Sequence, residues 1–230
     1  GWVCPGTTTA ISGSGAIAYT WMPAAGLSST VGTTVIANPI STTTYTITGT
    51  NGYGCTNTAM VTVTVHPLPP VYAGPGVAIC DRSSTTLTAT GAISYTWAPG
   101  YGLSVTVGNT VMANPRTTTT YTVTGIDRCV NSTTVTVTVN PLPTISAPGA
   151  TICMGQSATL SASGAVTYSW APATGLSAVV GSSVSAGPTA NTNYTVTGTD
   201  ANGCVNNTIS TVLVNLIPTI TTSPSVIMCN

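Results

Sequence analysis

The sequence predicts an all-β protein built from tandem antiparallel β-sandwich domains, and two observations carry this prediction. The first is a threefold repeat: the segments around Trp21, Trp97 and Trp170 (YTWMP, YTWAP and YSWAP) recur at a spacing of about 75 residues. The second is strand-like alternation, because valine alternates with threonine along residues 60–65 and 133–139. No segment keeps the spacing that an amphipathic helix needs, so we expect almost no helix.

The last repeat displays the order of the expected strands most clearly. Its second strand alternates so that Val166, Tyr168 and Trp170 share one face. Pro172 then ends this strand, because proline cannot donate a hydrogen bond to the ladder, and residues 200–203 (DANG) have the composition of a turn. The strands expected in this repeat cover residues 158–163, 166–170, 179–186, 193–197 and 208–214.

Proline-rich joints divide the chain into domains. Residues 66–70 (HPLPP), 140–143 (NPLP) and 215–218 (NLIP) each follow the closing strand of a repeat, and proline keeps such connections stiff and extended. The expected domains are residues 1–67, which lack their first strand, residues 68–141, residues 142–216, and residues 217–230 as the opening strand of a fourth.

The phase of the repeat has two explanations. Residues 1–4 (GWVC) align with residues 77–80 (VAIC), so the first repeat starts late, whereas residues 218–229 provide another opening strand. In the first explanation, which we favour, the chain is a window from a longer array, because arrays normally end in atypical capping repeats. In the second, the end of one chain completes the beginning of the next by donor-strand exchange.

The chain carries very little charge, and this excludes several classes of partner. Charged residues make up only 3% of the chain, against about 25% in ordinary domains. Three scattered arginines cannot neutralise a phosphate backbone or an anionic membrane surface, so neither is an expected partner. No apolar run approaches the ~20 residues of a membrane-spanning helix. Because surfaces of near-zero net charge associate, we expect the chain to pack against copies of itself, or to work where salt already screens charge.

No arrangement of residues indicates an active site, so we predict that the chain is not an enzyme. His66 is the only histidine, and it occupies a joint position that asparagine holds in the other repeats, at Asn140 and Asn215. The three aspartates are far apart in the sequence, so no paired carboxylates for acid–base catalysis are recognisable. The sequence contains no C-x-x-C motif, the spacing that would indicate a zinc site. We therefore predict no catalytic residue, no metal ligand and no cofactor.

Aromatic residues recur at fixed positions and are expected in the sandwich cores. A tryptophan on a central strand of a β-sandwich fills its core, and a tyrosine near the start of a later strand locks a corner. The alternative is that the Tyr-x-Trp pairs form an aromatic platform for sugars. The expected core aromatic residues are Trp21, Trp97, Trp170, Tyr45, Tyr121 and Tyr194.

The complete motif resembles a known type of repeat. A cysteine precedes the second strand, GA-x-x-Y-x-W-x-P and GLS follow, and residues 118–125 (TTTYTVTG), 200–204 (DANGC) and 139–143 (VNPLP) supply the rest. This pattern, which covers nearly the whole chain, resembles the PKD-like/Ig-like tandem repeats of very large Bacteroidota surface proteins exported by type IX secretion. The resemblance implies an extracellular or cell-surface protein that serves as an adhesin, a surface filament or a hook. The low charge departs from that pattern and favours a tight bundle of several chains.

Seven cysteines recur at a regular spacing, with two in each of the three repeats and the seventh at residue 229. This regularity predicts a disulfide framework, and hence an oxidising compartment outside the cytoplasm. The cysteines expected to form structural disulfides are Cys4, Cys55, Cys80, Cys129, Cys153, Cys204 and Cys229.

Three pairings of these cysteines are open. Pairing within a repeat, such as Cys4–Cys55, is the default. In an Ig-type topology these two positions lie at opposite ends of a sandwich, about 20 Å apart for a six-residue strand, whereas a disulfide needs Cα atoms within about 7 Å. Pairing between neighbouring repeats (Cys4–Cys129 and Cys80–Cys204) avoids this conflict. Pairing between chains is the third possibility.

These observations predict the structural shaft of an extracellular filament or giant repeat adhesin, assembled as a homo-oligomeric bundle. Its partners would be copies of itself, and other cell surfaces or glycans would be bound by the parent protein. The alternatives are a carbohydrate-binding module array of a secreted enzyme and a donor-strand-exchanged pilus subunit.

Overall fold

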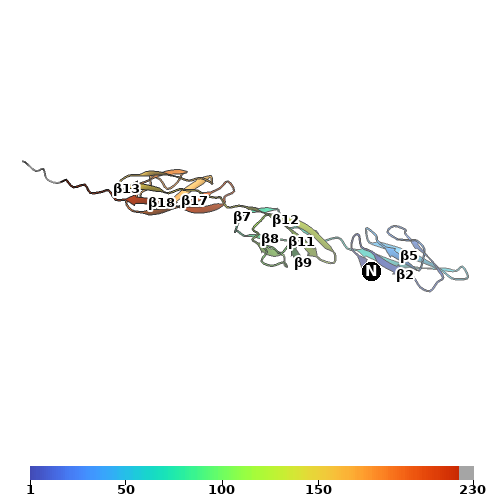
Figure 1. Cartoon of the computed structure of the whole chain (residues 1–230). Coiled ribbons are helices and arrows are strands. Elements are labelled where there is room, and N and C mark those ends of the chain that lie inside the picture. The colour runs from blue at the N-terminus through green and yellow to red at the C-terminus, as the bar shows by residue number, and fades with distance from the viewer. Residues whose placement is uncertain (223–230) are drawn as a thin grey trace, which may run out of the picture. The chain divides into compact units, whose positions relative to one another are not determined.

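The computed structural model describes residues 1–222, and all of their regular secondary structure is β-strand (Figure 1). The prediction of an all-β fold is therefore confirmed. The chain divides into two compact units. The first comprises Gly1–Val77 and Ser84–Val137, and the second comprises Ala78–Ser83 and the described residues from Thr138 onward.

The strands follow one another in the same order in each sequence repeat. Repeat 1 (residues 1–67) contains β1 (Trp2–Val3), β2 (Thr9–Ser12), β3 (Ala18–Met22), β4 (Thr34–Ala37), β5 (Thr43–Thr50) and β6 (Thr56–Val65). Repeat 2 (residues 68–141) contains β7 (Val77–Cys80), β8 (Thr85–Thr88), β9 (Ser94–Ala98), β10 (Thr110–Ala113), β11 (Thr119–Ile126) and β12 (Val130–Asn140). Repeat 3 (residues 142–216) contains β13 (Ala150–Cys153), β14 (Ala158–Ser161), β15 (Thr167–Ala171), β16 (Ser183–Ala186), β17 (Thr192–Thr199) and β18 (Val205–Asn215).

Two sheets make up the sandwich of each repeat. The larger sheets have the strand orders β1-β6-β5-β3, β7-β12-β11-β9 and β13-β18-β17-β15, and the smaller sheets pair β2 with β4, β8 with β10 and β14 with β16. Most pairs are antiparallel, but β1 runs parallel to β6, and β13 runs parallel to β18. We call residues 66–73, 140–147 and 215–222, which begin at the proline-rich joints, the linkers. The parallel pairing places the cysteine at the end of each opening strand beside the start of the linker that leaves the same repeat.

Alternating valine and threonine residues explain the long strand pairs. In β5 and β6, one face buries Tyr45 and Val63, whereas threonines occupy much of the other face. The hydroxyls of Thr44 and Thr62 are 2.8 Å apart across this pair, and an equivalent threonine pair lies across β11 and β12. Cross-strand hydrogen bonds of this kind stabilise an exposed sheet face. They let this chain keep a polar surface with almost no charge.

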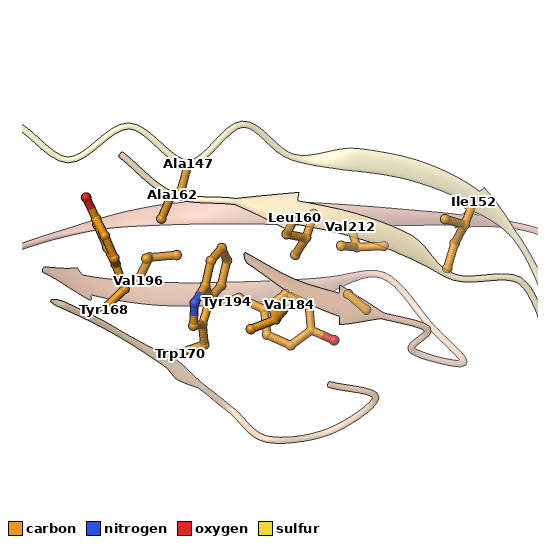
Figure 2. Close-up of a cluster of buried hydrophobic side chains, with 11 residues drawn as sticks. Ala147, Ile152, Leu160, Ala162, Tyr168, Trp170, Val184, Tyr194, Val196 and Val212 are labelled. Atoms are coloured by element: carbon orange, nitrogen blue, oxygen red, sulfur yellow. The ribbon is translucent and has the colours of Figure 1, made fainter. Parts of the chain in front are cut away.

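The core of repeat 3 illustrates how the alternation is used (Figure 2). On β15, Tyr168 and Trp170 are buried, and Leu160 and Val184 face them from the smaller sheet. The expectation that Val166 shares their face was wrong, because this side chain is 66% exposed. Residues 164–166 form a bend before β15 begins, and the period of two starts only after that bend.

All six expected aromatic residues lie in the cores, where each satisfies its polar atom on the backbone. The indole Nε1–H groups of the three core tryptophans donate to the carbonyls of Gly32, Gly108 and Gly181, each at 2.9 Å. The tyrosine hydroxyls donate to carbonyls 20 residues upstream, as Tyr194 does to Thr174 at 2.7 Å. The tyrosines therefore pin the connection after the third strand of each repeat, and the partner lies much farther upstream than in the expected corner.

Candidate functional site at the joints between repeats

Two disulfides link successive repeats. Cys4 is bonded to Cys129 and Cys80 to Cys204, with Cα–Cα distances of 5.7 Å and 5.5 Å. Both bonds join the cysteine at the opening strand of one repeat to the turn cysteine of the next. Among the three pairings that the sequence leaves open, the structure therefore has the one between neighbouring repeats.

Cys55 and Cys153 depart from the expectation that every cysteine forms a disulfide. Both carry free thiols and both are exposed. The reason is the register of the pairing, since each bond reaches into the adjacent repeat. Cys55 is the turn cysteine of repeat 1 and Cys153 is the opening cysteine of repeat 3, so neither has its partner position within residues 1–222. Cys229 lies outside the described residues.

Turn geometry positions the turn cysteines. In repeat 3, Oδ1 of Asp200 accepts hydrogen bonds from the backbone N–H groups of Asn202 and Cys204, at 2.8 Å and 2.9 Å. In repeat 1, Oδ1 of Asn51 accepts equivalent bonds from the N–H groups of Tyr53 and Cys55. Asp and Asn are favoured in turns because their side chains make such local bonds. The turn that holds the free Cys55 therefore has the same hydrogen bonds as the turn that holds the disulfide-bonded Cys204.

Parallel strand pairing positions the opening cysteines. In repeat 3, Cys153 lies opposite Asn215, and the N–H of Met154 donates to the carbonyl of Asn215 at 2.9 Å. In repeat 2, the N–H of Asp81 donates to the carbonyl of Asn140 at 2.8 Å in the same way. Each opening cysteine therefore sits beside the first residue of the linker that leaves its repeat.

The linkers at residues 66–73 and 140–147 each lie in a groove of the repeat that follows them. Val71 packs against Gly125 and Ile145 against Gly198, so closely that a Cβ atom on either glycine would overlap the aliphatic side chain. The linker also makes a backbone bridge to the strand end beside it: Ser146 and Ser163 exchange N–H to carbonyl bonds of 3.0 Å and 2.9 Å. The linker thus acts as an additional short strand of the repeat it enters.

An asparagine and a glycine fix the linker in each groove. The Nδ2 groups of Asn131 and Asn206 donate to the carbonyls of Pro69 and Pro143, each at 2.9 Å. Gly164 has φ +97°, and a Cβ there would overlap the carbonyl oxygen of Thr144. Gly91 meets the linker of repeat 2 in the same manner. Glycine is therefore needed both for its backbone angle and for the close approach.

Repeat 1 has the same groove in an open form. The groove has a volume of about 490 Å³ and is lined by residues that include Ala16, Ile47, Gly49, Cys55 and Asn57. These positions correspond to those that hold the linkers in repeats 2 and 3. Within residues 1–222, no linker enters this groove.

The single histidine lies at a joint. Nε2 of His66 is 3.3 Å from a guanidinium nitrogen of Arg128, and its ring meets Trp2 edge-on at a centroid distance of 5.7 Å. The carbonyl of His66 also lies 3.4 Å from Sγ of Cys129. Among the described residues, no three His, Cys, Asp or Glu side chains cluster as metal ligands would. His66 thus lies beside the Cys4–Cys129 disulfide, in contact with Trp2 and Arg128.

One family model matches part of the chain. Residues 142–218 match the family described as Ig-like domain CHU_C associated (Ig_7). These residues are repeat 3 and the two residues that follow it, and repeats 1 and 2 have the same strand order. Ig-like all-β domains of this kind are typical of structural and adhesion proteins. A comparison with curated protein sequences found no match.

Several solved structures are similar to the chain at low sequence identity. The N-terminal eight Ig domains of Down Syndrome Cell Adhesion Molecule match at 13% identity and a TM-score of 0.41, over 94% of this chain and 36% of that chain. The insect immune protein hemolin matches at 11% identity and a TM-score of 0.36, over 93% of this chain and 73% of that one. The chain thus spans about a third of the length of the first structure. Within residues 1–222, no helix has the length and apolar character to cross a membrane.

Proposed function

We propose that the chain is a segment of the structural shaft of an extracellular filament or repeat adhesin, of the kind that its motif resembles. Residues 1–67, 68–141 and 142–216 would act as successive Ig-like domains, and no catalytic role is assigned to them. The disulfides Cys4–Cys129 and Cys80–Cys204 are the observation that carries this proposal. A bond across each joint is what a shaft under tension needs, and it requires an oxidising compartment outside the cytoplasm.

Exposed apolar side chains support lateral contact between copies. Val31, Val107 and Val180 are each at least 61% exposed, although each forms a backbone bridge to the third strand of its repeat. The same edge of the larger sheet therefore carries an exposed valine in every repeat. Exposed apolar groups on the same sheet edge of each repeat, in a chain with almost no charge, favour association with like chains.

Electron microscopy and analytical ultracentrifugation of the oxidised chain test the proposal. We expect concentration-dependent assemblies with several chains side by side. The variant Val31→Asp/Val107→Asp/Val180→Asp should weaken the assembly, because it puts a charge on this sheet edge in each repeat. The matched control Thr44→Asp/Thr120→Asp/Asn193→Asp charges exposed positions on the larger sheets instead. Isolated monomers at every concentration would contradict the bundle.

A carbohydrate-binding array is the second candidate function. Its aromatic platform would need accessible tryptophans, but Trp21, Trp97 and Trp170 are buried, with no more than 3% of their surface exposed. Tryptophan fluorescence that does not respond to added glycans is expected for these core residues. A glycan-dependent shift that survives Trp2→Phe would favour the carbohydrate function instead, because Trp2 is the exposed tryptophan.

A further inference from the structure

We propose that Asn51 is a self-modification site, which loses its side-chain amide as ammonia and becomes aspartate through a cyclic imide with the backbone nitrogen of Gly52. The inference goes beyond the proposed function, because it concerns the covalent chemistry of one turn. An asparagine followed by glycine favours this reaction, since glycine has no side chain to hinder its own backbone nitrogen. The chain has two such pairs, Asn51–Gly52 and Asn202–Gly203.

The two asparagine–glycine pairs occupy different places in equivalent turns. Residues 51–55 (NGYGC) of repeat 1 align with residues 200–204 (DANGC) of repeat 3. In each turn the residue before the cysteine donates its N–H to the carbonyl of the first residue, at 3.1 Å and 3.2 Å. Asn51 is the first residue of its turn, whereas Asn202 is the third. The same fold therefore gives the two pairs different surroundings.

The side-chain carbonyl of Asn51 is polarised for attack at its carbon. Its Oδ1 accepts the backbone N–H groups of Tyr53 and Cys55, at 2.9 Å and 3.0 Å. When the attacking nitrogen adds to Cγ, negative charge develops on this oxygen, and two fixed donors already point at it. Preorganised N–H groups of this kind stabilise the oxyanion in acyl-transfer reactions. In repeat 3 the equivalent donors serve Oδ1 of Asp200 instead of Asn202.

The attacking nitrogen is also freer in repeat 1. Within residues 1–222, the N–H of Gly52 donates no hydrogen bond, and this glycine is exposed. The N–H of Gly203, by contrast, donates to the carbonyl of Asp200. That bond must break before the nitrogen can lose its proton and attack, which adds to the barrier. Both the carbonyl and the nitrogen therefore favour reaction at Asn51 over Asn202.

The turn is open to water whether or not its cysteine is bonded. In repeat 3, Cys204 is buried in a disulfide, yet residues 201–203 are exposed. The corresponding residues 52–54 of repeat 1 are exposed as well. A disulfide at Cys55 would therefore leave this part of the turn accessible to the water and hydroxide that the reaction needs.

The reaction consumes one water and releases one ammonia. The nitrogen of Gly52 gives up its proton and bonds to Cγ of Asn51, the Cγ–Nδ2 bond breaks, and Nδ2 leaves as ammonia with that proton. Water then opens the imide at Cγ to give aspartate, or at the backbone carbonyl carbon to give isoaspartate. Aspartate suits the turn, because Asp200 accepts the same two N–H bonds in repeat 3. The product adds a fourth acidic side chain to the three of this chain.

Peptide mapping by mass spectrometry follows both sites in one sample of the folded 230-residue chain, held in alkaline buffer. We expect Asn51 to convert to aspartate and isoaspartate on the order of tenfold faster than Asn202. In concentrated urea with reductant, where neither turn is formed, the two rates should become similar, because glycine follows both asparagines. Equal rates in the folded chain, or an unchanged ratio in urea, would overturn the proposal.

A variant of Gly52 tests the attacking nitrogen while it keeps the turn. Gly52→Ala should lower the rate at Asn51 to that of Asn202 or below, because the added methyl group hinders the nitrogen. The turn accepts alanine, since Ala201 holds this position in repeat 3, and a Cβ on Gly52 would lie 3.9 Å from the nearest side chain. An unchanged rate in Gly52→Ala would contradict attack by this nitrogen.

Transfer of the pair to repeat 3 tests the two donors. Asp200→Asn/Ala201→Gly builds the same asparagine–glycine pair into the turn whose cysteine is bonded to Cys80. Position 200 should then deamidate faster than Asn202 by a factor similar to that of Asn51, with circular dichroism as the control for folding. A folded variant in which position 200 reacts no faster than Asn202 would show that the turn does not promote the reaction.

Discussion

Tyr45, Tyr121 and Tyr194 bury their side chains completely in a protein that has almost no charge. Each hydroxyl donates to one backbone carbonyl, at 2.7 to 2.8 Å. Burial raises the pKa of all three phenols above the usual value near 10, and nearby threonine side chains only partly oppose this shift. The charged phenolate would lose its hydration in the core, so the folded state favours the protonated form.

This raised pKa predicts a loss of stability at alkaline pH. Above about pH 10 the unfolded chain releases protons that the folded tyrosines keep, so the free energy of unfolding falls by up to about 1.4 kcal/mol per pH unit and per tyrosine. The stability is fully present below that pH and continues to fall until the folded pKa is reached. Urea unfolding between about pH 8 and about pH 11 measures the slope, and Tyr194→Phe should reduce it. An equal slope in Tyr194→Phe would contradict the prediction.

Gly164 and Gly15 form a natural pair for testing the linker contact. Both have a left-handed φ, at +97° and +94°, so an added Cβ brings the same backbone strain at both positions. At Gly164 the Cβ would also overlap the carbonyl oxygen of Thr144. We therefore expect Gly164→Ala to lower the free energy of unfolding by about 1–3 kcal/mol more than Gly15→Ala does. Chemical denaturation of the reduced monomer measures both, and equal losses would show that the linker is not held there.

At the scale of strands, the sequence predicts most of the elements because residues that alternate in the sequence also alternate between the buried and exposed faces of the folded strands. The expected strand at residues 193–197 lies inside β17, and the one at residues 208–214 lies inside β18. The weaker pattern at residues 179–186 yields only the four residues of β16. Val166 fails because a bend precedes β15, and periodicity alone cannot locate where a bend ends.

The joint was harder to predict from sequence than the strands were. The regular spacing of cysteines points to a framework, but the pairing depends on which ends of the sandwich meet. The parallel pairing of β13 with β18 determines which ends meet, and no local sequence motif predicts that pairing. The free thiols of Cys55 and Cys153 follow from that register. The repeated asparagine at positions 57, 131 and 206 was a usable signal, since a polar side chain recurred beside each turn cysteine.

The disulfides predict a difference between two pairs of cysteine substitutions. Cys80–Cys204 closes a loop with a sequence separation of 124 residues, which stabilises the folded chain by on the order of 4 kcal/mol through the entropy of the unfolded state. Cys80→Ser/Cys204→Ser should therefore lower the melting temperature of the oxidised monomer. Cys55→Ser/Cys153→Ser should leave it unchanged, because both thiols are free and exposed. Calorimetry of the two double variants compares them directly, and similar losses would argue against the observed pairing.

At the scale of the whole molecule, the scarcity of charge predicts how assembly responds to salt. With only three basic and three acidic side chains, ionic attraction contributes little between copies. Raising NaCl from about 0.1 M to about 1 M shortens the Debye length from about 10 Å to about 3 Å, yet association should persist or strengthen. Sedimentation velocity at both concentrations measures this. Dissociation in high salt would instead point to ion pairs as the adhesive contacts.

The two disulfides enclose overlapping stretches of chain, one from Cys4 to Cys129 and the other from Cys80 to Cys204. A single backbone cut anywhere between residues 4 and 204 therefore leaves both fragments covalently attached to each other. The proline-rich linkers that begin at residues 66 and 140 each lie inside one of these loops. A protease that nicks an accessible linker would not sever the molecule, and fragments would separate only after reduction. Such tolerance of damage suits the extracellular shaft that we propose, because a broken peptide bond cannot be replaced outside the cell.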